Sequence, residues 1–404
     1  MDLVIQPGMT YYRISSIFNV PLQQLLNANP YTNPSMLRIG QVIKVPYYQT
    51  HSYKIQSGDT LWSVSQNNQI PLDQILATNP IDPYQLRVGD TITLPVRINN
   101  DILNFDQLYT SERLEDDLFT LVNQYPFISL REIGRSVQNK PIYEVSIGEG
   151  DKHVHINGSF HANESITTSV IMRFLHDYLL SLSSGEPIRD VNMNAFYDQI
   201  TLSLVPMVNP DGVDLINQGL PDDEAIRDLV LSINNQSTNF NNWKANIRGV
   251  DLNNQYPANW EIESNRKRQQ PSPRNYPGPY PLSEPEAKTM ANLVEEKGFD
   301  RVLALHTQGE VIYWGYEGLE PREAQTIVNE YGRVSGYIPI RYVDSHAGFK
   351  DWYIQEYRRP GYTVELGRGT NPLPFSQFDE IYEETLGIFL VNLFFEKRGW
   401  DRIK

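Results

Sequence analysis

Two histidines and two glutamates stand in contexts that suit metal chemistry. His161 and Glu164 follow a Gly-Ser-Phe segment, His306 ends an apolar run, and Glu365 lies in a Tyr-Thr-Val-Glu-Leu segment. Two histidines and a carboxylate are the usual protein ligands of a catalytic zinc ion that keeps its fourth position open for water. The second glutamate would then act on that water as a base. The pattern predicts hydrolysis at a site that holds one Zn²⁺ ion.

The composition limits the partners of such a site. The chain has 404 residues, of which 34 are Lys or Arg and 49 are Asp or Glu, so that its net charge is −15. This charge argues against nucleic acid and against an anionic membrane, because both attract an excess of Lys and Arg. There is no cysteine, so any metal must be held by histidines and carboxylates.

The first residues and the hydropathy of the chain give a prediction about its location. Residues 1–8 lack a basic start and an apolar run, and no stretch of the sequence approaches the ~20 apolar residues of a membrane span. We therefore predict a cytoplasmic protein without membrane insertion. A leader missing from the sequence, or association with the spore or the cell wall, is the alternative.

The front of the chain contains an internal repeat. Residues 5–12 match residues 55–62 at an offset of 50 residues, and residues 38–43 match residues 87–92 at an offset of 49. A fixed period of this size indicates two copies of one supersecondary unit. In each copy a short strand and a Gly turn lead to two helical stretches, and a second Gly turn leads to a closing strand.

This βααβ unit resembles the LysM domain, and the matching positions cover the whole unit twice. We therefore place one LysM domain at residues 1–48 and a second at residues 51–96. The resemblance implies binding of glycans that contain N-acetylglucosamine, such as peptidoglycan or chitin. Two weak modules in tandem would gain avidity through a high effective concentration. The alternative is that the repeats only pack against the rest of the chain.

Strand and helix patterns alternate after residue 105. A helix is expected from Ser165 to Leu182, and an apolar helix from Ile381 to Phe395. The segment 283–286, Ser-Glu-Pro-Glu, has the form of a capping box that opens a further helix. Short buried strands are expected to end just before or at the candidate metal-binding and catalytic residues. The alternation predicts an α/β fold with a mixed central sheet flanked by helices, and ligands bind where such strands end.

Five motifs in order resemble the zinc metallocarboxypeptidases. They are His161-x-x-Glu164, Asn-Pro-Asp-Gly at residues 209–212, Gly-Val-Asp-Leu-Asn at residues 249–253, His306 and Glu365. We place this catalytic domain at residues 106–400. Together with the LysM repeats, the chain resembles in particular the γ-D-glutamyl-diamino-acid endopeptidases of spore-forming bacteria, a subfamily that couples such repeats to this domain.

The resemblance implies roles for individual residues. His161, Glu164 and His306 would be the zinc ligands, and Asp251 would orient the imidazole of His161. Glu365 would be the general base and then carry the proton to the leaving amine.

Other roles are less closely matched. We expect Arg248 to stabilise the tetrahedral oxyanion, although the family's usual position, directly after a Trp, would select Lys244. Tyr342 lies one residue from the place of the family's mobile substrate-capping tyrosine.

Two departures from the family pattern concern the substrate. The motif that normally ends in Asn-Arg, and clamps the terminal carboxylate of a substrate, reads Asn253-Asn254 here. The position that lines the specificity pocket is Lys350 instead of an apolar residue. We expect all three to bind substrate, with Lys350 pairing a carboxylate on a diamino acid or on a D-glutamyl residue. The basic run at residues 266–268 is expected on a surface loop, with contact to an anionic substrate as the alternative.

Together these features predict a zinc-dependent peptidoglycan hydrolase that cuts the γ-D-glutamyl–meso-diaminopimelate bond of stem peptides. Its partners would be stem peptides and glycan that contains N-acetylglucosamine, with no nucleic acid and no membrane insertion. One alternative is a zinc carboxypeptidase or amidase on another peptidoglycan bond. Another is a glycan-binding structural protein, for instance of the spore coat, with an inactive catalytic domain. The sequence leaves the oligomeric state and the role in sporulation open.

Overall fold

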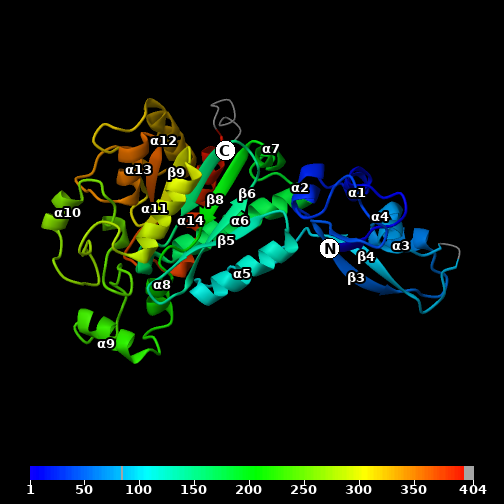
Figure 1. Ribbon diagram of the computed structural model, residues 1–404, viewed down its shortest axis with the longest axis horizontal. Coiled ribbons are helices and arrows are strands. Elements are labelled where there is room, and N and C mark those ends of the chain that lie inside the picture. Colours follow the sequence, from blue (N-terminus) through cyan, green and yellow to red (C-terminus); the bar gives the residue numbers. More distant parts are fainter. Residues whose placement is uncertain (83–84, 395–404) are drawn as a thin grey trace. The chain divides into compact units, whose positions relative to one another are not determined.

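The chain folds into two compact units in a computed structural model that describes residues 1–82 and 85–394 (Figure 1). One unit contains Met1–Ile102, Leu118–Ser129 and Leu179–Glu186, and the other contains Leu103–Asp117, Leu130–Tyr178 and the chain from Pro187 onward. Phe395, the expected end of the last helix, and residues 395–400 of the expected catalytic domain lie outside the described residues.

The N-terminal unit contains the two predicted repeats, and each is a strand–helix–helix–strand unit. The first consists of β1 (Asp2–Val4), α1 (Tyr11–Phe18), α2 (Leu22–Asn27) and β2 (Val42–Lys44). The second consists of β3 (Tyr48–Lys54), α3 (Leu61–Asn68), α4 (Leu72–Thr78) and β4 (Thr91–Arg97). In each repeat the two strands pair in antiparallel orientation. The predicted βααβ topology is confirmed.

Side-chain caps and amide contacts explain the local geometry of the repeats. Thr10 and Thr60 occupy equivalent positions, and each accepts a hydrogen bond from the backbone three residues later, which caps α1 and α3. The amide of Gln74 in α4 donates to the carbonyl of Ile17 at 3.0 Å and to the hydroxyl of Tyr48 at 3.2 Å. The contact with Ile17 of α1 joins the second repeat to the first.

The C-terminal unit is built on one mixed sheet. Its strands are β5 (Ser129–Arg135), β6 (Pro141–Ile147), β7 (Lys152–Asn157), β8 (Ile200–Val205), β9 (Arg301–Thr307), β10 (Val311–Tyr313), β11 (Ile338–Ile340) and β12 (Gly361–Leu366). The order across the sheet is β11-β10-β12-β9-β7-β8-β6-β5. Strands β12, β9, β7 and β8 run parallel, whereas β6 and β10 run antiparallel to their neighbours β8 and β12. The α/β fold class is as predicted.

Helices surround this sheet. They are α5 (Ser111–Gln124), α6 (Ile166–Ser184), α7 (Asn194–Tyr197), α8 (Pro210–Asn217), α9 (Glu224–Ile233), α10 (Trp260–Arg266), α11 (Pro285–Lys297), α12 (Arg322–Ser335), α13 (Phe349–Tyr357) and α14 (Phe378–Leu393). Short 3₁₀ turns lie at Ala162–Glu164, Leu252–Asn254 and Phe375–Gln377. Within the part of the chain that the structure describes, no helix combines the length and the apolar character needed to cross a membrane.

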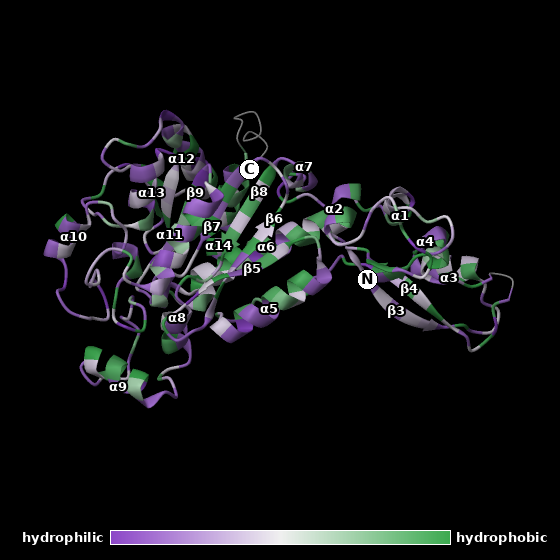
Figure 2. Ribbon diagram, in the orientation of Figure 1, coloured by the Kyte–Doolittle hydropathy of each residue, from purple (hydrophilic) through white to green (hydrophobic). Residues whose placement is uncertain are grey.

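Strand β9 is buried along its whole length, because helices cover both faces of the sheet. Val302 and Ala304 belong to a core that includes Phe349 and other apolar residues of α11 and α13. On neighbouring β12, Tyr362 contacts Tyr331 of α12 edge-on, with ring centroids 5.0 Å apart. Figure 2 shows hydrophobic residues along the central strands of this sheet.

Helix α11 starts where the sequence predicted, but its capping differs. Pro285 is the first residue of the helix and Glu284 occupies the N-cap position, yet the Glu284 side chain makes no capping hydrogen bond. It accepts a hydrogen bond of 2.7 Å from the buried amide of Asn246 instead. The predicted capping box is therefore wrong, because the Glu284 carboxylate bonds to a residue distant in sequence instead of capping the helix.

Candidate active site and metal centre

The metal-ligand candidates and the candidate base lie at or just beyond the C-terminal ends of the central parallel strands. His161 and Glu164 follow β7, with Glu164 in the 3₁₀ turn that leads into α6. His306 lies near the end of β9, and Glu365 is its direct partner in the register of β12. Residues in register on neighbouring strands face the same side of a sheet. Segments more than 140 residues apart in sequence therefore meet here.

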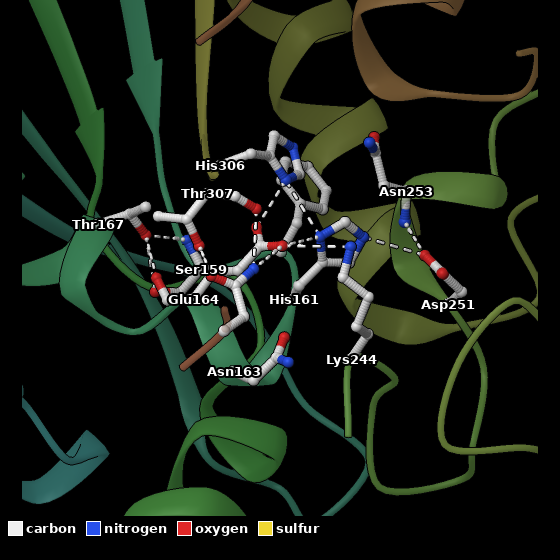
Figure 3. A network of polar contacts seen from close by, with 12 residues as sticks. Ser159, His161, Asn163, Glu164, Thr167, Lys244, Asp251, Asn253, His306 and Thr307 are labelled. Carbon is white, nitrogen blue, oxygen red and sulfur yellow. Dashed lines mark hydrogen bonds and ion pairs between the residues drawn. The ribbon is translucent and has the colours of Figure 1, made fainter. Parts of the chain in front are cut away.

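Three buried side chains converge on one point. The Nδ1 atom of His161 lies 2.9 Å from one carboxylate oxygen of Glu164, and the Nδ1 atom of His306 lies 2.9 Å from the other. The two Nδ1 atoms are 3.1 Å apart. Figure 3 shows the three side chains turned toward one another.

This donor set fits a zinc ion. Imidazole nitrogens and carboxylate oxygens are the ligands that zinc takes in catalytic sites, and three protein ligands leave a fourth position open. One potential ligand atom from each of His161, Glu164 and His306 lies within 4.8 Å of the other two. Burial opposes a charge on His161, but Glu164 and Asp251 outweigh it and raise the pKa of this imidazole to about 9. Burial, by contrast, lowers the pKa of His306, so this imidazole is favoured in the neutral form that binds a metal ion.

Asp251 holds the other nitrogen of His161. One of its carboxylate oxygens lies 3.2 Å from the Nε2 atom of His161 and also accepts the backbone N–H of Asn253. The other oxygen accepts the backbone N–H of Asn275 at 3.2 Å. Although burial opposes ionisation, His161 and Lys244 bring the pKa of Asp251 well below its usual range. A carboxylate in this position fixes the imidazole so that Nδ1 faces Glu164.

Glu365 lies in the pocket beside this centre. It lines a cavity of about 220 Å³ together with His161 and Lys244. Burial, with the nearby charge of Glu164, raises the pKa of Glu365 to about 8. A cation held by the three ligands would lower this pKa, because an opposite charge favours the carboxylate.

The structure brings Lys244, and not Arg248, to the pocket. The Nζ atom of Lys244 lies 3.3 Å from a carboxylate oxygen of Glu164. Arg248 is outside the lining and half exposed, and its guanidinium lies 3.5 Å from Glu284. The prediction that Arg248 lies beside the scissile carbonyl is therefore wrong, and the local backbone explains why. The side chain of Asn246 accepts the N–H of Arg248 at 3.0 Å and closes a turn that directs the arginine away.

The expected substrate-binding residues divide into two groups. Asn253, Asn254 and Lys350 line the pocket. Tyr342 does not, since it is 53% exposed and its hydroxyl donates to Glu320 at 3.3 Å.

Sequence reasoning missed several residues of the site. Asp351 and Tyr313 line the pocket. Lys267 lines it as well, in agreement with the alternative placement of its basic run near the substrate rather than on a surface loop. Asn371 donates to a carboxylate oxygen of Glu164 at 3.4 Å and to the carbonyl of Thr307 at 2.9 Å. No local pattern marks Asn371, because it lies 207 residues from Glu164. The position of Asp351 directly after Lys350 was the one usable signal.

Comparison with known proteins agrees with this architecture. The zinc carboxypeptidase family model matches residues 114–387, and the LysM domain model matches residues 3–46 and 53–95. Over 395 residues, the chain is 52% identical to gamma-D-glutamyl-L-diamino acid endopeptidase 1 of Lysinibacillus sphaericus. The aligned region covers 98% of this chain and 100% of that protein.

Solved structures agree on the fold. Bovine thrombin-activatable fibrinolysis inhibitor, solved in complex with tick carboxypeptidase inhibitor, superposes with a TM-score of 0.56 at 18% identity, covering 72% of this chain and 97% of that chain. Carboxypeptidase A from Helicoverpa armigera gives a TM-score of 0.56 at 18% identity, covering 74% and 75% of the two chains. The chain therefore belongs to the zinc carboxypeptidase family, as a zinc metallopeptidase that carries two LysM domains.

Proposed function

We propose that this peptidase is a peptidoglycan hydrolase that cuts the bond between γ-D-glutamate and meso-diaminopimelate in stem peptides. In this proposal the LysM domains, residues 1–48 and 51–96, hold glycan that contains N-acetylglucosamine, and residues 106–400 perform the hydrolysis. The likeness to a gamma-D-glutamyl-L-diamino acid endopeptidase along nearly the whole chain, LysM domains included, supports it.

The observation that carries the substrate proposal is the lining of the pocket beside Glu365. Asn254 lies where the family resemblance places an arginine that clamps a terminal carboxylate, and the described lining contains lysines but no arginine. Lys350 takes the specificity position. This combination favours an acidic, branched substrate over an ordinary C-terminal residue with an apolar side chain.

The side chains divide the chemistry among them. His161, Glu164 and His306 would hold the zinc ion, which supplies Lewis-acid chemistry when it is bound. Glu365 accepts the proton of the attacking water and later delivers it to the leaving amine. The ammonium of Lys244 stabilises the negative charge that develops on the scissile carbonyl oxygen.

Two exposed aromatic side chains support glycan binding by the repeats. Tyr12 and Trp62 occupy equivalent positions in the two copies, and they are 77% and 65% exposed. Large aromatic side chains with an apolar body and a polar edge suit contact with partly hydrated ligands such as sugars. We assign these two residues to the glycan contact.

A cleavage assay tests the proposal. The purified protein is incubated with disaccharide-tripeptide, and the products are followed by mass spectrometry, with chelator and after zinc is added back. We expect free diaminopimelate that disappears with chelator and returns with zinc. Cleavage between muramic acid and L-alanine would replace the proposal with an amidase. Absence of cleavage by zinc-loaded protein would refute this bond as the substrate and favour another substrate or the glycan-binding structural protein.

The repeats are tested separately. The double variant Tyr12→Ala/Trp62→Ala should lose retention on insoluble peptidoglycan and keep its turnover of the soluble disaccharide-tripeptide. Retention equal to that of the unchanged protein would refute the assignment of the two aromatic residues.

The place of action is part of the proposal. We propose the cytoplasm, with the spore or the cell wall as the alternative. Immunoblots of cytoplasmic, wall and spore fractions distinguish these locations.

A further inference from the structure

A buried ion pair lies in the wall of the active-site pocket. Lys350 and Asp351 are neighbours in the first turn of α13, and both line the pocket that contains Glu365. The Nζ atom of Lys350 lies 2.5 Å from a carboxylate oxygen of Asp351 and 2.9 Å from the carbonyl oxygen of Gly315. The side chains are only 5% and 7% exposed.

Stability gives a weak reason for such a pair. The free-energy cost of removing two charges from water is about as large as their attraction returns, so that apolar residues of similar size often stabilise a fold equally well. The pair also keeps bonding capacity. Among the described residues, Lys350 uses two of its three N–H donors, and Asp351 accepts from Lys350 and from the backbone N–H of Gly348 at 3.2 Å. One donor and further acceptor positions remain for a ligand.

The other two lysines of the pocket are each paired with a carboxylate that does not line the cavity. Lys244 lies 3.3 Å from Glu164, and Lys267 lies 3.1 Å from Glu263. Neither of these two glutamates belongs to the described lining. Among the described residues, Lys350 and Asp351 differ from these pairs, because the lysine and its carboxylate partner both line the cavity. This wall therefore presents one positive and one negative charge side by side.

We infer that Lys350 and Asp351 together recognise a zwitterionic amino-acid head group, the distal end of the meso-diaminopimelate side chain. The inference rests on the proposed function. The distal carbon of this residue carries an ammonium and a carboxylate, which Asp351 and Lys350 respectively complement. A lysine side chain brings the ammonium alone, so it leaves Lys350 without a counter-charge and adds a like-charge contact. Such mismatches discriminate between ligands more strongly than lost apolar contact does.

The test compares three peptides of the form L-Ala-γ-D-Glu-X. X is meso-diaminopimelate, the same residue amidated at its distal carboxylate, or L-lysine. The zinc-loaded full-length proteins are the unchanged chain, Lys350→Met and Asp351→Asn. Lys297→Met is the matched control, because Lys297 lies 4.0 Å from Glu144 and is outside the described lining of the pocket. kcat and KM are measured for each combination.

We expect the unchanged protein to favour diaminopimelate over the other two peptides by about 100-fold in kcat/KM, because the lysine or amide analogue brings no carboxylate to the remaining N–H donor of the buried Lys350. Lys350→Met should abolish this preference by lowering only the diaminopimelate value. Asp351→Asn should lower the values for all three ammonium-bearing peptides about 10-fold, and Lys297→Met should change none of them.

Two failures are distinguishable. If the unchanged protein cleaves none of the peptides, the proposed function falls and the inference falls with it. If it cleaves the diaminopimelate and lysine peptides equally, or if Lys350→Met lowers all three in one ratio, the pair is structural. The inference is then overturned while the proposed function stands.

Discussion

Replacing Asp251 with asparagine should weaken zinc binding without removing a zinc ligand. Asp251 receives the Nε2–H of His161 at 3.2 Å, and the substitution keeps the shape of the side chain but removes its charge. A hydrogen bond to a charged group contributes roughly 1.5–3 kcal/mol and a neutral one roughly 0.5–1.5 kcal/mol. The difference of about 1–1.5 kcal/mol predicts a Kd for zinc that is about 10-fold higher, since ~1.4 kcal/mol corresponds to a factor of ten. This value is at the lower end of the ~10–100-fold found for partners of metal ligands.

The same substitution also affects stability, and a control separates the two effects. The backbone N–H of Asn275 donates to Asp251 at 3.2 Å, and an amide in that place presents a donor to a donor. Asp211 gives a matched control, because it is buried and accepts the backbone N–H of Gln138 at 2.8 Å and the hydroxyl of Ser136 at 2.9 Å. Asp251→Asn and Asp211→Asn should both lower the free energy of unfolding. Only the first should weaken zinc binding.

Zinc Kd is measured by competition with a chromogenic chelator at neutral pH, and stability by urea unfolding of the zinc-free proteins. Equal zinc affinity in Asp251→Asn and the unchanged protein would refute the role of Asp251 in orienting His161. Equal losses of zinc affinity in both variants would assign the effect to general destabilisation.

Three further predictions concern single residues. Glu365→Gln should retain stoichiometric zinc by metal analysis and lose turnover by roughly 10²–10⁴-fold, the usual contribution of a general base; turnover near that of the unchanged protein would remove Glu365 from this role. Lys244→Met should lower kcat by about 100-fold or more while Arg248→Met changes it little, as expected for loss of one group that stabilises an oxyanion; the reverse order in steady-state assays would restore Arg248. Burial raises the pKa of Glu286 from its usual 4.5 to about 8. The neutral form is favoured in the fold, so this residue's contribution to stability is present below pH ~4.5 and is lost as the pH rises to ~8. Urea unfolding at pH 5 and pH 9 should show a decline that is smaller in Glu286→Gln, and an equal decline would contradict the buried, neutral carboxyl.

Sequence order and local pattern were sufficient for the repeats. Each LysM unit closes its own strands and helices within about fifty residues, so local turns and caps such as those at Thr10 and Thr60 determine it. The mixed sheet and the strand-end positions of His306 and Glu365 were also predictable, because apolar runs mark buried strands and functional side chains follow them.

Orientation of long side chains could not be predicted in the same way. Arg248 and Lys244 lie four residues apart in one loop. The family position directly after a Trp selected Lys244, but we predicted Arg248, and the structure places Lys244 in the pocket. The turn held by the side chain of Asn246 decides it. The capping box at residues 283–286 was predicted wrongly for the same reason. The amide of Asn246, in a distant segment, donates a hydrogen bond to the Glu284 carboxylate.

Residue types, their spacing and local periodicity are properties of the chain, so the type of chemistry, the α/β class and the two repeats could be predicted without a structure. Which side chains share the pocket depends on the folded structure. It brings Asn371 to Glu164 and Lys267 to the pocket wall, and it turns Tyr342 away toward Glu320. The physical reason is that these contacts join segments far apart in sequence, or follow a loop whose course is set by packing and distant hydrogen bonds.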